Sequence, residues 1–197
     1  MARTSAFVAG VDEAGRGPLA GPVVAAVVVL GSSDIQGLAD SKTLSRSERQ
    51  RLFAEIQAES LAFSLGSASP IEIDCLNIHK ATLLAMKRAI TRVLVPIEIV
   101  LVDGKFTPQM GLNMRAVVKG DTYIKEISAA SILAKESRDI TMEKYDVLYP
   151  GYGFRQHKGY PTKFHLEALH KLGPTPIHRI SFKPVNDVLS IGKNVRQ

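Results

Sequence analysis

The stretch Gly10–Pro18, GVDEAGRGP, decides how the rest of the chain is interpreted. It follows the apolar run 7–9, which predicts a buried strand. That strand ends in two adjacent carboxylates, Asp12 and Glu13, ahead of a glycine–arginine–glycine turn. Buried carboxylates are costly unless they are paired, protonated or bound to a metal. Two interpretations stay open for these nine residues alone: a strand that surfaces into a solvated turn, or a functional site.

The composition predicts one globular α/β domain over residues 1–197, including a C-terminal extension from about residue 146. Hydrophobic residues make up 45% of the chain, which is enough for a sizeable core. The single cysteine, Cys75, excludes an internal disulfide, favours a reducing compartment and lies in an apolar stretch typical of a core. The net charge of +6 favours a polyanionic partner, although many basic proteins bind no nucleic acid.

Nothing in the sequence predicts a membrane role. The N-terminus lacks the apolar segment of a signal peptide, and the longest apolar run, 23–30, is too short to span a bilayer. We expect a cytoplasmic monomer.

Hydrophobic periodicity divides the chain into strands and helices. The strands are expected at 7–13, 22–30, 61–66, 97–102 and 114–118, and the helices at 46–59, 70–95, 126–145 and 163–172. The short glycine-rich connection between the first two strands predicts an antiparallel pair, while later strands are joined through helices. The fold class is therefore α/β, with a mixed β-sheet flanked by helices.

Three apolar strands end in carboxylates beside a glycine or a turn. These carboxylates are Asp12 with Glu13, then Asp103, then Asp121. Strand ends of one sheet can converge, and oxygen ligands without a Cys or His cluster favour Mg²⁺ or Mn²⁺. Two such ions would suit phosphodiester hydrolysis. Each carboxylate alone has an ordinary explanation as a cap or a turn residue. Neighbours on a strand also face opposite ways, so Asp12 and Glu13 share one site only if the strand twists or bulges.

Two further segments have the composition of ligand contacts. In Gly15-Arg16-Gly17 the backbone can approach a ligand closely while Arg16 faces a phosphate, although a tight turn explains the glycines equally well. The basic segment 155–163 contains His157 and Tyr160 and suits phosphate contact with stacking, or it is an ordinary basic loop.

The sequence resembles bacterial ribonuclease HII over nearly its whole length. The resemblance rests on GVDEAGRGPLAGPVVAAVV, DSKTLS, LVDG, VVKGD, EISAASILAK…RD and GYGF…HKGYPTKFH, in that order. It implies a ribonuclease H-like fold with a C-terminal helical extension. It also implies Mg²⁺- or Mn²⁺-dependent endonucleolytic cleavage of the RNA strand of RNA–DNA hybrids. Incision 5′ of single ribonucleotides embedded in duplex DNA is implied as well, with 5′-phosphate and 3′-hydroxyl ends.

The resemblance also assigns site residues. The metal-binding, catalytic acids fall on Asp12, Glu13, Asp103 and Asp121. The motif that senses the 2′-hydroxyl falls on Gly15, Arg16 and Gly17, and the tyrosine that stacks on the following deoxyribose falls on Tyr160. Lys42, Ser128, Ser131 and Lys135 are further candidates for substrate binding. Two alternatives stay open: a nuclease of the same fold that acts on DNA alone, and a catalytically silent hybrid-binding module.

Overall fold

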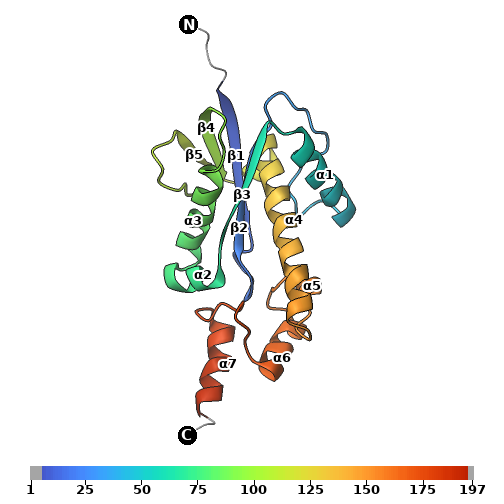
Figure 1. Cartoon of the computed structure of the whole chain (residues 1–197), viewed down its shortest axis with the longest axis vertical. Helices are drawn as coiled ribbons and strands as arrows, with labels where there is room; N and C mark the ends of the chain where they lie inside the picture. The colour runs from blue at the N-terminus through green and yellow to red at the C-terminus, as the bar shows by residue number, and fades with distance from the viewer. Residues whose placement is uncertain (1–5, 195–197) are drawn as a thin grey trace.

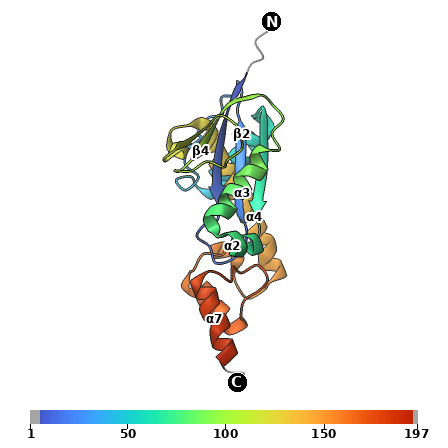
Figure 2. The same ribbon diagram turned by 90° about the vertical axis from the view of Figure 1, so that its left-hand side faces the viewer.

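A central sheet lies between two helical layers. A computed structural model describes residues 6–194, and the side chains of residues 6–190. Helices α2 (Pro70–Leu76) and α3 (Ile78–Ile90) cover one face of the sheet, and α1 (Arg46–Glu59) and α4 (Lys125–Leu148) cover the other (Figure 1). Beyond the end of the sheet lie α5 (Phe154–His157), α6 (Lys163–Leu172) and α7 (Lys183–Asn194), which Figure 2 shows from the side.

The sheet is mixed, as the sequence predicts. Its five strands are β1 (Phe7–Ala14), β2 (Val23–Val29), β3 (Ala62–Ala68), β4 (Ile97–Asp103) and β5 (Met114–Val117), in the order β3-β2-β1-β4-β5. β2 pairs antiparallel with β1 and β3, whereas β1, β4 and β5 run parallel. The carboxyl ends of three parallel strands therefore meet at one edge region of the sheet.

Burial on both faces explains why β2 is apolar throughout. Its odd-numbered residues, from Val23 to Val29, pack against α3, and its even-numbered Ala26 and Val28 pack against α1 and α4. The same alternation in β1 places Ala9 and Val11 on the α3 face. Asp12 is therefore turned toward the α4 face.

The structure differs from the sequence prediction in the helices. The region expected to be one helix over 70–95 is two, because Asn77 adopts a left-handed φ of 68° and caps α3 through its side chain. The segment 151–162, expected to be a loop, contains α5, and the tail after residue 173 contains α7, which the sequence prediction omits. Cys75, expected in the core, is exposed at the end of α2.

Two small apolar clusters join the C-terminal segment to the body. One gathers Ala20, Met142, Tyr152, Phe154, Ala168 and Ile177, and the other gathers Leu19, Leu169 and Val185. The connection after β1 thus packs on residues more than a hundred positions away. None of the helices within residues 6–194 is long and apolar enough to cross a membrane.

We predict that Gly10→Ala destabilises the protein by at least about 1–3 kcal/mol, because an added methyl overpacks the contact between β1 and α4. A Cβ at Gly10 would lie 2.1 Å from the carbonyl carbon of Glu126, and backbone cannot move aside cheaply. Thermal unfolding measures the change. Gly17→Ala is the control, since its Cβ would make an ordinary 3.5 Å contact with Tyr160. Equal melting temperatures for Gly10→Ala and the unmodified protein would contradict this account of the packing.

Candidate active site

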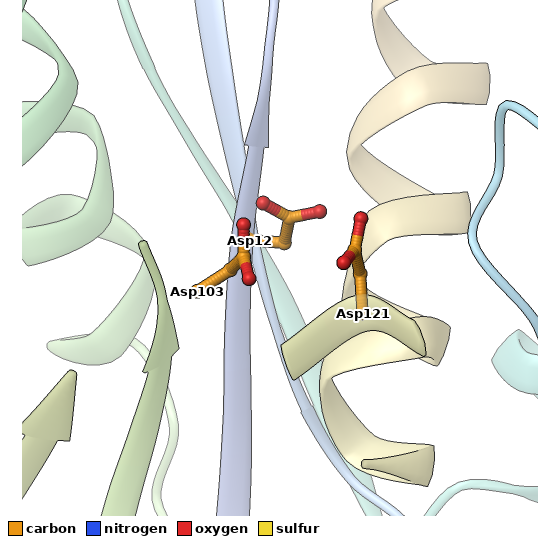
Figure 3. A group of neighbouring side chains, drawn as sticks. All are labelled: Asp12, Asp103 and Asp121. Atoms are coloured by element: carbon orange, nitrogen blue, oxygen red, sulfur yellow. The ribbon is translucent and has the colours of Figure 1, made fainter. Parts of the chain in front are cut away.

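Three carboxylates converge at the carboxyl ends of the parallel strands. Asp12 lies near the end of β1, Asp103 is the last residue of β4, and Asp121 lies in a short 3₁₀ turn, Gly120–Thr122, that follows β5 (Figure 3). One oxygen from each side chain lies within 4.8 Å of those of the other two. The expected convergence of strand ends therefore occurs for these three acids.

Local contacts hold two of these acids in place. The Gly120 N–H donates to Asp103 Oδ1 at 2.8 Å, which ties the end of β4 to the turn that carries Asp121. Ser128 Oγ donates to the Asp121 carbonyl at 2.7 Å from the first turns of α4. A Cβ at Gly120 would meet Ile127 Cδ1 at 2.5 Å, so a larger residue there would displace the end of this side chain.

Glu13 occupies a different position from the other acids. It lies outside the three-carboxylate group, because β1 continues regularly to Ala14 and adjacent residues face opposite sides. Glu13 borders a small cavity beside His79 and Met86 of α3, and it also lines the larger cavity that contains Asp12. Arg16 Nη1 lies 3.4 Å from Glu13 Oε1. The four acids thus border one region, with Glu13 at its rim.

Crowding of the acids disfavours their ionised forms. Burial raises the pKa of Asp12 well above its usual range, and the charges of Glu13 and Asp103 raise it further. Burial likewise raises the pKa of Glu13, and burial together with Asp103 raises the pKa of Asp121. Arg16 beside Glu13 and Lys42 beside Asp121 oppose this effect, but they do not offset it, so the acids remain short of positive charge.

The donor set fits a hard divalent cation. All three converging ligand groups are carboxylates, and no histidine or cysteine belongs to the group that the described residues form. Oxygen-only sets of this kind suit Mg²⁺ and Mn²⁺ better than Zn²⁺. A cation bound there would supply the charge that the raised pKa values indicate is missing.

A cavity of about 490 Å³ opens beside the acids. Its walls come from the β1 end, the segment before α1, the middle of α4 and the turn before α6. They contain Asp12, Glu13, Ala14, Gly15, Arg16, Gly17, Ser41, Lys42, Arg49, Asp103, Ser131, Lys135, Arg138 and Tyr160.

Most of the candidate substrate-binding residues border this cavity. Lys42 Nζ lies 3.6 Å from Asp121 Oδ2 on an extended, largely exposed side chain. Ser131 Oγ lies 2.9 Å from Ser41 Oγ, and Lys135 is paired with Asp139 at 2.8 Å. Ser128 differs from them, because it is absent from the cavity wall. Its hydroxyl contacts the Asp121 backbone instead.

Tyr160 stands opposite the glycine–arginine–glycine turn. A Cβ added to Gly17 would lie 3.5 Å from Tyr160 Cε1, so the ring and the turn are in close proximity. The ring is 43% exposed and faces the same cavity as Arg16. His157, a weaker candidate for substrate contact, instead uses both ring nitrogens on the backbone of Tyr152 and Gly159.

Two buried arginines, to which the sequence analysis assigns no role, shape the turn. Arg179 is fully buried, and its guanidinium donates to the carbonyls of Gly15, Arg16, Pro18 and Gly21 at 2.6–3.0 Å. Arg138 donates to the Ala20 and Pro22 carbonyls at 3.1 Å. Gly15, with φ of 95°, leaves no room for a Cβ beside Arg138. No local sequence pattern marks Arg179 as a site residue, since it lies in the tail after residue 173, where no element is predicted.

We predict that Asp12→Asn raises the melting temperature of the metal-free protein at pH 7. Because folding raises the pKa of Asp12, protonation favours the folded state. The ionised Asp12 carboxylate therefore lowers the free energy of unfolding at pH values above its folded-state pKa. This destabilisation is lost as the pH falls through that pKa. Asparagine does not ionise, so this destabilisation is absent at pH 7. Each 1 kcal/mol gained in the free energy of unfolding raises the melting temperature by about 2–4 °C.

Calorimetry in EDTA at pH 7 and at pH 5 provides the measurement. The difference in melting temperature between Asp12→Asn and the unmodified protein should be smaller at pH 5. Asp34→Asn serves as the control, because Asp34 is exposed and paired with Lys125, which lowers its pKa. A lower melting temperature for Asp12→Asn at pH 7 would show that the cluster is not short of positive charge.

Comparison with known proteins agrees with this architecture. A family model described as Ribonuclease HII matches residues 9–185. The structure of ribonuclease H2 from Pyrococcus horikoshii OT3 superposes with a TM-score of 0.80 at 27% identity, covering 94% of this chain and 98% of that one. RNase HII from Archaeoglobus fulgidus, solved as a complex with PCNA, gives a TM-score of 0.75 at 26% identity over 89% and 95% of the two chains.

Bst-RNase HIII in complex with Mn²⁺ gives a TM-score of 0.74 at 17% identity, covering 96% of this chain and 71% of that one, and this likeness shows the fold alone. The expected ribonuclease H-like fold is confirmed. Since the family model spans most of the sequence, the chain belongs to the ribonuclease HII family and is an endoribonuclease of the ribonuclease H type, acting on RNA–DNA hybrids with divalent-metal dependence.

Proposed function

We propose that the enzyme also incises duplex DNA 5′ of single embedded ribonucleotides, and that it leaves 5′-phosphate and 3′-hydroxyl ends. One observation supports this most: the wall that bears Asp12 and Asp103 continues into the glycine–arginine–glycine turn and Tyr160. A site for chemistry and a site able to test one sugar are therefore adjacent. A nuclease that recognised only the helical shape of an extended hybrid would not require a sugar contact beside its acids.

In this proposal Asp12, Asp103 and Asp121 hold the cations, and Glu13 completes the set from the rim. Mg²⁺ and Mn²⁺ both suit these oxygen ligands. Divalent cations held by these acids would supply activation of the attacking water and stabilisation of the negative charge on the departing 3′-oxygen. The chain itself then needs no nucleophilic side chain, and its contribution is to hold the acids and orient the strand.

The turn Gly15–Gly17 recognises the 2′-hydroxyl, which distinguishes RNA from DNA at a given position. Arg179 already occupies the carbonyl oxygens of Gly15 and Arg16, so we assign the recognition to the N–H groups of this turn. Tyr160 stacks on the deoxyribose that follows the ribonucleotide. Its proximity to Gly17 allows both neighbouring sugars to be tested at once.

The positively charged side chains around the cavity contact phosphates of the substrate. Arg16 and Lys42 have exposed side chains, and Lys135 lies deeper, beside Asp139. Ser131 supports the scissile region through its bond with Ser41, while Ser128 acts by fixing the Asp121 backbone. We retain the proposals that the enzyme is a monomer and that it is cytoplasmic.

We predict that Asp103→Asn lowers cleavage at a single embedded ribonucleotide by at least about a hundredfold, since even one lost electrostatic stabiliser costs about 10²–10³ in rate. The assay uses a labelled DNA duplex with one ribonucleotide, in Mg²⁺ and in Mn²⁺, with end-group analysis of the products. Duplex binding should change little, and the melting temperature of the metal-free protein should not fall, because asparagine removes a charge that raises the pKa of Asp12 and Asp121. Near-normal turnover would remove Asp103 from the metal site.

Two controls separate the competing functions. An all-DNA duplex of the same sequence should remain intact, and its cleavage would favour a DNA nuclease. A long RNA–DNA hybrid tests the general ribonuclease H activity. Binding of the embedded-ribonucleotide duplex without incision, in either metal, would refute the proposed incision and leave only hybrid cleavage.

We predict that Tyr160→Ala reduces cleavage at an embedded ribonucleotide by about 5- to 150-fold, which corresponds to loss of a stacking contact of about 1–3 kcal/mol. Cleavage of a long hybrid should fall less, because several neighbouring sites can bind there. Tyr160→Phe, which keeps the ring, is the matched control and should retain most activity. Equal losses on both substrates would make Tyr160 a general contact.

A further inference from the structure

Two buried imidazoles link the C-terminal segment to the turn that carries Tyr160. His165 lies in the first turn of α6, and His178 precedes Arg179. Their exposed fractions are 0% and 2%. His165 Nδ1 lies 2.9 Å from the Tyr160 carbonyl oxygen, and the two Nε2 atoms lie 3.1 Å apart. The pair thus runs directly to the backbone of Tyr160.

Hydrogen-bond partners determine where each proton lies. The Thr175 N–H donates to His178 Nδ1 at 2.9 Å, so this nitrogen carries no proton. A neutral His178 therefore has its proton on Nε2 and donates it to His165 Nε2. His165 must then hold its own proton on Nδ1, from which it donates to the Tyr160 carbonyl. Each bond in the chain has one donor and one acceptor.

His157 reinforces the same turn from the other side. The Gly159 N–H donates to His157 Nδ1 at 3.1 Å, which leaves the proton on Nε2 to donate to the Tyr152 carbonyl at 2.8 Å. The His157 and His165 rings are stacked, with centroids 4.5 Å apart. The charge of Asp146 favours protonation of His157, but burial lowers the pKa of this histidine more. Protonation of His165 would place a charge against the His157 ring.

Burial favours the neutral forms. It lowers the pKa of both His165 and His178 to about 4, and their mutual proximity lowers the pKa of His178 further. The hydrogen bonds from His178 to His165 and from His165 to the Tyr160 carbonyl are called the relay below. At neutral pH both imidazoles are neutral, so the relay keeps a single arrangement of protons. The same Tyr160 carbonyl also accepts from the Thr162 N–H at 2.8 Å, so both of its lone pairs are used.

We propose that His165 is a positioning residue for junction cleavage: through its Nδ1–H, oriented by His178, it fixes the backbone at Tyr160 and so holds the tyrosine ring over Gly17. This inference rests on the proposed function, since it assigns His165 an effect through Tyr160. The competing explanation is that the histidines are core residues that merely stabilise the C-terminal segment. The two explanations differ in which substrates are affected and in how variants combine.

The arrangement of protons can be tested without activity. Nitrogen-15 NMR of the full chain at pH 7 should show His165 protonated on Nδ1, and His157 and His178 protonated on Nε2. A proton on His165 Nε2, or a charged His165, would overturn the relay whatever the enzyme cleaves.

His165→Leu removes both bonds and should lower the ratio of embedded-ribonucleotide cleavage to long-hybrid cleavage by about tenfold, the equivalent of one hydrogen bond of about 1–1.5 kcal/mol. His165→Asn, whose amide nitrogen occupies the place of Nδ1, should restore most of this ratio even if the melting temperature stays low. Leu169→Ala is the matched control, because it removes a fully buried side chain four residues along α6 that carries no polar atom. It should lower stability without changing the ratio.

The variants combined with Tyr160→Ala complete the test. Adding His165→Leu to Tyr160→Ala should change the substrate ratio less than twofold, because the tyrosine ring through which His165 acts is already absent. A further tenfold loss in the double variant, or an equal effect of Leu169→Ala, would overturn the proposal. If Tyr160→Ala leaves the ratio unchanged while the NMR result holds, the proposed role of Tyr160 fails and the positioning role fails with it, but the relay stands.

Discussion

The structure depends on one electrostatic constraint: carboxylates from three separate strand ends share a space a few ångströms across. Three of their oxygens lie within 4.8 Å of one another, and burial raises the pKa of Asp12 and Asp121. The folded chain therefore accepts an unfavourable charge arrangement that a bound divalent cation would relieve. Much of the surrounding framework counteracts this repulsion, including the Gly120 N–H bond to Asp103 and the Ser128 bond to the Asp121 backbone.

A second constraint concerns the loop after β1. This loop turns sharply and lines the cavity, yet its segment between β1 and β2 forms no regular structure of its own. Arg179 and Arg138 satisfy its carbonyl oxygens from within the protein. A guanidinium presents several donors in a fixed plane, so one side chain can hold several carbonyls in a defined arrangement. The C-terminal segment thus contributes to the active site although it lies far from the acids in sequence.

The same segment approaches the site from both sides of the proposed sugar-binding region. Arg179 organises the turn at Gly15–Gly17, and the neighbouring His178 orients His165 toward Tyr160. Because these two residues are adjacent, one short stretch holds the two elements that would compare neighbouring sugars. Discrimination of a single sugar requires this kind of rigidity, since small displacements of either element would weaken recognition.

The sequence by itself determined the sheet, because long apolar runs and a glycine-rich connection leave few alternatives for β1, β2 and β4. It also located the four acids, since each ends a strand or a turn. It could not decide that Glu13 lies apart from Asp12, Asp103 and Asp121, which depends on β1 staying regular past Asp12. Nor could it identify Arg179 or the relay through His165: a lone arginine or histidine has the same local signature in a core as in a site, and only long-range packing brings it to the backbone it holds.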